Sequence, residues 1–396
     1  MTTRSLHIDS IAHGGFGVAR EDGRVVFVAD AIPGETVEAR IIEEKKSFAR
    51  AVATAVLEPS PDRVEHPWTE ARLDRQPELR AGGADFGHIT IERQRALKAE
   101  VMSDAIARFG GGAFPAEIRV QGVDPDRAWR TRVSLHVAAN GTAGPRAARS
   151  HEVIAVEDYP LAVPALAELA PWRERYPGAD RVDLVATSTG EVVVRVLAPG
   201  EPVSNRRITE TVAGRRFALA EAGFWQVHRS AAATLSAAVA RALNPELLDA
   251  QADHLDLYGG VGLLAVPVLE AIGAQAKLST VESAPGASEY AAENLQDWIG
   301  SRAIGGRVEQ FLQREGVSAG ATVVLDPPRA GAGREVSQRL ARSDAAQIVY
   351  VACDPVAFAR DLGTFREGGW DAVSLEAFDL FPDTHHVELV ARLEPR

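Results

Sequence analysis

The pattern of apolar and polar residues divides the chain into stretches with different periods. Over residues 5–57, short apolar runs such as 24–28 and 36–42 are separated by glycine turns. Turn signals every 8 to 12 residues or so are typical of a small β-barrel. From about Ala218 onward, helical patterns alternate with buried-strand patterns. This alternation predicts an α/β fold with a parallel, doubly wound sheet.

The stretch between these two patterns is less regular. Prolines interrupt it between residues 59 and 67, and residues 62–88 show no clear period, which predicts a linker or an irregular module. Residues 91–109 carry apolar side chains at helical spacing, and strand-like pieces between 129 and 196 predict an α+β module. We therefore expect three units, over residues 1–57, 58–217 and 218–396. The helix over 91–109 is a candidate to pack on the third unit.

Composition adds limits on the class of protein. With 396 residues, 46% hydrophobic and 25% charged, the chain resembles a soluble protein of two or three domains, which excludes wholesale disorder. Its longest apolar run, 263–269, is far shorter than the roughly 20 residues that span a bilayer. The polar start of the chain lacks the apolar core of a signal peptide. We expect a cytoplasmic protein without membrane association, and nothing demands more than a monomer.

Charge and cysteine usage give two further constraints. The formal net charge of −12 argues against a protein held on nucleic acid by its overall charge. Two arginine-rich segments, 127–149 and 206–216, leave two interpretations open: local RNA contact or ordinary surface cations. The single cysteine, Cys353, excludes an internal disulfide and a thiolate metal cluster, so a lone thiol remains.

The first chemical motif is a strand that enters a glycine turn. Residues 255–262 read Leu-Asp-Leu-Tyr-Gly-Gly-Val-Gly, and the next strand ends at Glu282. Glycines let the backbone approach a ligand at the carboxyl ends of strands, and a carboxylate there can accept hydrogen bonds from ribose hydroxyls. The spacing differs from Gly-x-Gly-x-x-Gly, which favours S-adenosylmethionine over a nicotinamide cofactor. A plain strand–helix turn is the alternative.

The second motif, at residues 323–331, ends another buried strand with Asp326, Pro327, Pro328 and Arg329. Two prolines fix the backbone and remove two donors, so this segment predicts a rigid rim that presents Asp326 and Arg329. A purely structural turn is the alternative.

Two more segments supply a nucleophile and a base. Cys353 follows the strand 347–352 and precedes a helix that starts near Pro355. A lone cysteine is commonly inert and buried, but a helix N-terminus or a cation lowers the pKa of a thiol and activates it. Within 381–389, Glu388 adjoins an apolar strand and is a candidate general base. The adjacent His385 and His386 lack a second group of ligands, so we expect no metal site.

In this order, the four segments resemble the RNA uridine-5-methyltransferase family, the class I S-adenosylmethionine enzymes that make 5-methyluridine in tRNA and 23S rRNA. Residues 224–228, Phe-Trp-Gln-Val-His, extend the match. The beginning of the chain resembles a TRAM domain, the OB-like RNA-binding barrel of the rRNA-modifying branch. The resemblance is strongest over 218–396 and weakest over 150–215.

The resemblance implies an enzyme and a set of site residues. A Cys353 thiolate would add to C6 of a flipped-out uracil, and Glu388 would remove the C5 proton. Asp326 and Arg329 complete the expected catalytic set, with Arg329 beside the uracil. The expected S-adenosylmethionine contacts are Gln226, Tyr258, Gly260, Glu282 and Asp326. The implied partner is structured RNA, with rRNA favoured over tRNA. The rivals are a methyltransferase acting on another RNA nucleoside and a noncatalytic RNA-binding protein that retains the fold.

Several positions depart from the family pattern. Many rRNA-modifying members hold an iron–sulfur cluster, but Ala81-Gly82-Gly83-Ala84 and Tyr159-Pro160 stand where the family has Cys-Gly-Gly-Cys and Cys-Pro. We expect no cluster, and packing to hold the linker instead. Gly259, Leu263 and His228 replace a cysteine and two asparagines of the family. The residues that recognise adenine stay unassigned.

Overall fold

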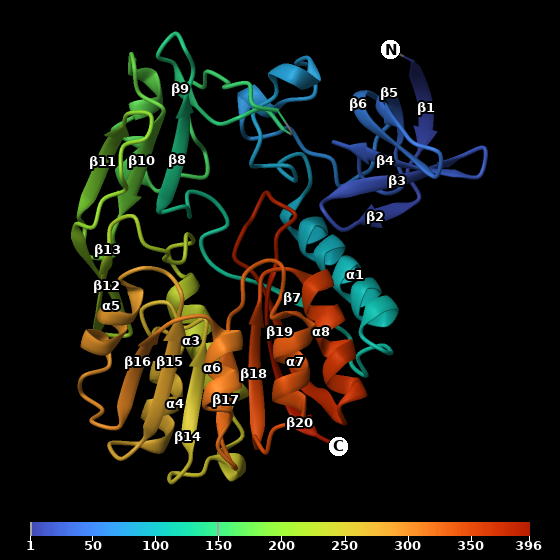
Figure 1. Cartoon of the computed structure of the whole chain (residues 1–396). Helices are drawn as coiled ribbons and strands as arrows, with labels where there is room; N and C mark the ends of the chain where they lie inside the picture. Colours follow the sequence, from blue (N-terminus) through green and yellow to red (C-terminus); the bar gives the residue numbers. More distant parts are fainter. Residues whose placement is uncertain (1, 149) are drawn as a thin grey trace.

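The computed structural model of the protein describes residues 2–148 and 150–396, and its strands form four sheets (Figure 1). Arg149, a member of the first arginine-rich segment, lies outside the described residues. No helix among those residues is long and apolar enough to cross a membrane.

The first sheet is a curved six-stranded unit in the order β1-β5-β6-β4-β3-β2, drawn in blue in Figure 1. Its strands are β1 (Thr3–His7), β2 (Ser10–Ala12), β3 (Phe16–Glu21), β4 (Arg24–Ala29), β5 (Thr36–Glu44) and β6 (Phe48–Glu58). Buried and open positions alternate along β5, because successive side chains of a strand point to opposite faces. The buried face encloses its own apolar core, in which Ile8, Val26 and Val28 are fully buried. The strand-rich N-terminal unit expected from the turn spacing is confirmed.

The middle of the chain forms a four-stranded sheet in the order β11-β10-β8-β9 and a separate hairpin. The strands of the sheet are β8 (Arg132–Val137), β9 (Ala143–Gly144), β10 (Arg181–Ala186) and β11 (Val192–Leu197), and the hairpin consists of β12 (Arg207–Val212) and β13 (Arg215–Ala220). Short helices occupy the connections: η1 (Thr69–Ala71), η2 (Pro77–Leu79), α2 (Pro164–Ala167) and η3 (Pro171–Arg173). Helices α2 and η3 are both short, and each has a proline at its start, where a helix tolerates one; Pro171 would interrupt any continuous helix across this stretch.

The largest sheet has eight strands in the order β16-β15-β14-β17-β18-β20-β19-β7. Its strands are β7 (Val120–Gly122), β14 (Asp253–Leu257), β15 (Lys277–Glu282), β16 (Ser301–Gly305), β17 (Thr322–Leu325), β18 (Gln347–Ala352), β19 (Trp370–Asp379) and β20 (Glu388–Pro395). Strands β14 to β18 run parallel, whereas β20 is antiparallel to both of its neighbours. The expected doubly wound α/β fold is confirmed.

Helices cover both faces of this sheet. They are α1 (Ile91–Phe109), α3 (Ala231–Ala242), η4 (Pro245–Leu247), α4 (Ala265–Ile272), α5 (Ala287–Asn294), α6 (Val308–Arg314), α7 (Gly333–Ala341) and α8 (Pro355–Glu367). Alternate residues of one strand enter different apolar clusters: Ile348 and Tyr350 of β18 pack with α7 and α8, whereas Val349 and Val351 pack with α3 and α4. Strand β7 and helix α1 join this layered unit although they precede the middle sheet in the sequence.

An aromatic cluster occupies the segment where many rRNA-modifying members of the resembled family have iron–sulfur ligands. The ring of Tyr159 lies 4.8 Å from that of Trp68 and 5.8 Å from that of Trp172, measured between centroids. Ala81 and Ala84 are buried in the same apolar cluster. Both indole N–H groups donate to backbone carbonyls, so the polar edges of these rings are satisfied as well. Packing of large rings therefore holds this segment together.

We expect Tyr159→Ala to destabilise the protein by about 3 to 5 kcal/mol, because it removes a buried ring from between two indoles and leaves a cavity. Tyr159→Phe keeps the ring and serves as the matched control, with a loss below about 1 kcal/mol. Denaturant unfolding followed by tryptophan fluorescence measures both. Equal stability of the two variants would show that the ring does not support this segment.

Candidate active site

Four of the side chains expected at the site follow or end neighbouring strands at one edge of the large sheet. Tyr258 follows β14, Glu282 ends β15, Asp326 follows β17 and Cys353 follows β18. The parallel registers of these strands place their carboxyl ends side by side. Residues distant in sequence thereby meet where folds of this class bind their ligands.

The antiparallel strand β20 brings Glu388 to the cysteine. Ala352 of β18 pairs with Leu389 of β20, and one further step in this register places Cys353 opposite Glu388. Glu388 is buried, with 5% of its surface exposed, whereas Cys353 is half-buried. A thiol that substrate can reach therefore faces a carboxyl group largely removed from water.

The glycine turn is fastened to Glu282. The Gly260 amide donates to the Glu282 carboxylate at 3.1 Å, and the Ala284 amide donates to its other oxygen at 2.5 Å. Tyr258 has a φ of +59°, which is unusual for a residue with a side chain and turns the backbone sharply at the end of β14. A Cβ at Gly260 would meet no heavy atom within 4 Å, so there is open space beside the turn.

Asp256 is a functional candidate that the sequence motif contained but that we did not single out. It is fully buried in β14, and Thr280 donates to one of its carboxylate oxygens at 3.0 Å. Burial raises the pKa of Asp256 to about 7. A Cβ at Gly259 would lie 2.1 Å from the Thr280 hydroxyl oxygen and 2.4 Å from that carboxylate, so only glycine fits there. The sequence did contain a signal for this residue, because an aspartate within an otherwise apolar strand is unusual.

The carboxyl groups around the cysteine raise one another's proton affinity. Burial raises the pKa of Asp326 to about 7. Burial, followed by the charge of Asp326, holds the pKa of Glu388 well above its ordinary value, and the Arg329 cation opposes this shift. Burial and then the charges of Glu388 and Asp326 raise the pKa of the Cys353 thiol to about 12, again against Arg329. The two carboxyl groups, the thiol and the Arg329 cation are therefore close enough to interact electrostatically.

The Cys353 thiol has a higher pKa than we expected from its position before the N-terminus of helix α8. The first amides of α8 are already engaged, since the Asp354 carboxylate accepts hydrogen bonds from Val356 at 3.0 Å and Ala357 at 2.8 Å. This capping carboxylate neutralises the positive end of the helix that would stabilise a thiolate. Cys353 consequently holds its proton at neutral pH before substrate binds.

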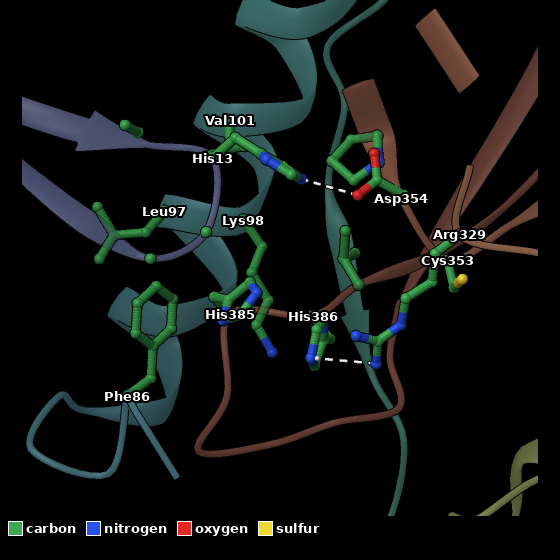
Figure 2. A pocket seen from close by; sticks show the side chains of 15 residues that line it. His13, Phe86, Leu97, Lys98, Val101, Arg329, Cys353, Asp354, His385 and His386 are labelled. Atoms are coloured by element: carbon green, nitrogen blue, oxygen red, sulfur yellow. Dashed lines mark hydrogen bonds and ion pairs between the residues drawn. The ribbon is translucent and has the colours of Figure 1, made fainter. Parts of the chain in front are cut away.

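The paired histidines are bound to other residues. His386 accepts from the Arg329 guanidinium at 3.4 Å (Figure 2). His385 bonds to the Asp85 carboxylate at 2.6 Å. Burial, His385 and Arg329 lower the pKa of His386 to about 3, so this ring is neutral and can act as the acceptor. The pair orients Arg329 and ties the segment before Glu388 to the linker.

Helix α1 holds the same segment from the other side. Lys98 and Asp379 form a fully buried ion pair at 2.5 Å, and Lys98 also donates to the Phe381 carbonyl. Gln94 donates to the Asp383 carboxylate at 3.0 Å and accepts from its amide at 2.8 Å. These bonds fix the loop that leads into β20, and so support the position of its first residue.

Gln226 is buried on the segment after β13. The next residue, Val227, accepts from the Thr131 amide at 2.8 Å, and His228 stacks on Trp129 with the centroids 5.6 Å apart. Within the part of the chain that the structure describes, no hydrogen bond joins Gln226 to the other expected site residues. Its role as a cofactor contact therefore stays a prediction.

The second arginine-rich segment is largely neutralised by carboxylates. Its ion pairs include Arg206–Glu191, Arg207–Glu293 and Arg215–Asp297. In the first segment, Arg132 is largely buried and lies 3.8 Å from Glu210. Arg127, Arg146 and Arg216 are exposed. The arginine content of 206–216 therefore gives no broad positive face, and the interpretation as ordinary structural cations fits it better.

Comparison with known proteins supports the same interpretation. Residues 2–54 match the TRAM domain family and residues 308–395 match the tRNA (Uracil-5-)-methyltransferase family. An "uncharacterized RNA methyltransferase" of Streptomyces avermitilis is 39% identical over 98% of this chain and 98% of its own. One from Corynebacterium diphtheriae is 32% identical over 98% of this chain and 96% of its own.

Among solved structures, the fold resembles that of Pyrococcus abyssi tRNA (uracil-54, C5)-methyltransferase, determined with S-adenosyl-L-homocysteine. The TM-score is 0.72 at 21% identity, over 98% of this chain and 99% of that one. The likeness covers the barrel, the middle sheet and the large sheet together. From its relatives and its two matched domains, the chain belongs to the RNA methyltransferase family that joins a TRAM domain to a tRNA (uracil-5-)-methyltransferase domain.

Proposed function

We propose that the protein transfers a methyl group from S-adenosylmethionine to C5 of a uridine in structured RNA, through a covalent bond between Cys353 and C6. The observation that carries this proposal is that the register of β18 and β20, which ends at Ala352 and Leu389, brings Cys353 close enough to Glu388 and Asp326 for their charges to raise the pKa of its thiol. The P. abyssi neighbour, a tRNA (uracil-54, C5)-methyltransferase in complex with S-adenosyl-L-homocysteine, supports it.

The residues around the glycine turn fit a nucleoside cofactor. The turn leaves open space beside Gly260, and its amide fixes the Glu282 carboxylate at the end of β15, where ribose hydroxyls could donate to it. We assign Tyr258, Gly260, Glu282, Asp326 and Gln226 to this binding site. S-adenosylmethionine supplies one electrophilic methyl group, which C5 of uracil accepts only after nucleophilic addition at C6.

The chain's own residues account for the remaining steps. The thiol of Cys353 gives its proton to Asp326 and its sulfur bonds to C6, while the C5–C6 π electrons move toward the C4 oxygen. The Arg329 guanidinium stabilises the negative charge that develops there. After methylation, Glu388 takes the C5 proton, and the released electron pair re-forms the C5–C6 double bond as the carbon–sulfur bond breaks. The thiolate then recovers the proton held by Asp326, and Glu388 releases the C5 proton to solvent.

We expect the substrate to be rRNA rather than tRNA, because the TRAM-like barrel resembles that of the rRNA-modifying branch. The P. abyssi neighbour is a tRNA enzyme, so any assay needs both RNA classes. We expect a monomer, since one chain already supplies every group in the proposed mechanism.

The direct test is methyl transfer with purified protein, labelled S-adenosylmethionine, and separated rRNA and tRNA from a strain that lacks the gene. We expect label in 5-methyluridine, and a loss of at least roughly 10³-fold in Cys353→Ala, because no other group can add to C6. Equilibrium dialysis with the cofactor is the control for folding of that variant. Label in another nucleoside, or normal turnover by Cys353→Ala, would contradict the proposal.

Glu388→Gln is expected to accumulate a covalent protein–RNA adduct, because addition and methylation precede removal of the C5 proton. Denaturing electrophoresis of labelled RNA measures the adduct, with the double variant Cys353→Ala/Glu388→Gln as the matched control. If Glu388→Gln turns over slowly without an adduct in any sample, Glu388 is not the base.

The rate should depend on pH through Asp326. A carboxyl group accepts a proton only when ionised, and a pKa of about 7 leaves Asp326 protonated at lower pH. We therefore expect kcat/KM to fall by up to about tenfold per unit as the pH decreases below about 7, with a plateau above it. Initial rates measured from about pH 5.5 to about pH 8.5 give the pH dependence of kcat/KM. A flat profile would exclude Asp326 as the acceptor.

A further inference from the structure

A cavity adjoins the residues of the proposed active site. Its volume is about 160 Å³, and Cys353 and Arg329 form one wall of it. Asp326 and Glu388 are not among its lining residues, so it lies apart from the catalytic carboxyl groups. In Figure 2 the sulfur of Cys353 points away from His385 and His386, with Arg329 between them. The cavity and the reacting atoms thus lie on two sides of one wall.

The opposite wall comes from the N-terminal barrel. The turn between β2 and β3, residues 12–15, lines the cavity, and His13 bonds to the Asp354 carboxylate at 2.9 Å. A Cβ at Gly15 would lie 2.9 Å from both the Asp85 carboxylate and the Cβ of His385. Gly15 also has a φ of +79°, so only glycine suits this close approach. The barrel is therefore fitted to the catalytic unit around this cavity.

The lining suits a flat, uncharged heteroaromatic group. Val101 provides partly exposed apolar surface on one side, with the buried side chains of Phe86 and Leu97 beside it, and the imidazoles of His13 and His386 provide flat polar rings. Such walls can stack on a base and hydrogen-bond to its edge.

Charge in the cavity is largely compensated. Lys98, which also lines it, is neutralised by its buried partner Asp379, and the Asp354 carboxylate is bonded to His13. Arg329 keeps its positive charge, because its partner His386 is neutral, but the proposed mechanism directs this cation to the uracil. One cation that is engaged by the uracil favours a base in the cavity over a phosphate, which several uncompensated cations would bind.

We propose that this cavity receives the base of a nucleotide adjacent to the target uridine. The inference rests on the proposed function for the position of the uridine, because the two ligands share the wall of Cys353 and Arg329. Taking a uridine out of an RNA stack also disturbs its neighbours. A stacked neighbouring base would offset part of that cost and hold the strand in register with the thiol.

The test is a double-mutant cycle between the protein and the RNA. Val101→Phe fills the cavity from α1 without changing a residue of the proposed mechanism. The probes are an RNA stem–loop that contains the uridine identified by nucleoside analysis, and the same stem–loop with an abasic site at each flanking position. For the wild-type protein, we expect one abasic RNA to bind roughly 5- to 100-fold more weakly in fluorescence anisotropy, as lost base stacking predicts. Val101→Phe should bind the intact and the abasic RNA equally, both at the weakened level.

Val203→Phe, which enlarges an exposed valine outside the cavity, is the matched control and should keep the wild-type difference. His13→Ala is the second cavity variant, in case Val101→Phe does not fold, and should reduce the penalty of the abasic site. The proposal is wrong if neither flanking base affects binding, or if the cavity variants keep the full wild-type penalty. If the coupling holds but Cys353→Ala still methylates this RNA at the normal rate, the covalent reaction is refuted and the base cavity stays supported.

Discussion

The antiparallel pairing of β18 with β20 is the constraint on which the candidate site depends. Successive residues of a strand point to opposite faces, so a slip of one residue would turn Glu388 away from Cys353. The strands that flank this pair oppose such a slip, because β17 and β19 are hydrogen-bonded on its two sides. Buried side chains on both faces of β18 further fix the register. The geometry of two reacting groups is thus set by the core of the sheet.

The electrostatics of the site follow from placing acids together at that edge. Asp256 and Asp326 have pKa values of about 7, and Cys353 has one of about 12, mainly because burial disfavours their charged forms. Raised pKa values mean that these carboxyl groups favour the folded state when protonated. That contribution is full below their ordinary pKa near 4 and is lost as the pH rises to about 7. Burial of these acids therefore costs stability at neutral pH, and strongly shifted pKa values of this kind are common at functional sites.

Elements outside the large sheet complete the site. Gln94 and Lys98 of α1 fix the loop before Glu388, while the barrel turn at residues 12–15 approaches the same loop from the other side. The aromatic cluster of Trp68, Tyr159 and Trp172 holds the segment between them by packing. Because a buried ion pair such as Lys98–Asp379 is costly to desolvate, its value here lies more in fixing one arrangement than in stability.

The sequence by itself determined the fold class, the strand-rich N-terminal unit and the position of each chemical group along the chain. Those features depend on local periodicity, glycine turns and motifs such as 255–262 and 323–331. It did not reveal the full proton affinity of Cys353, since that depends on carboxyl groups brought close only by the sheet, and on Asp354 capping α8. It also did not reveal the Arg329–His386 contact or the barrel turn beside the cysteine. Only the tertiary structure decided these, because each joins residues that no local pattern connects.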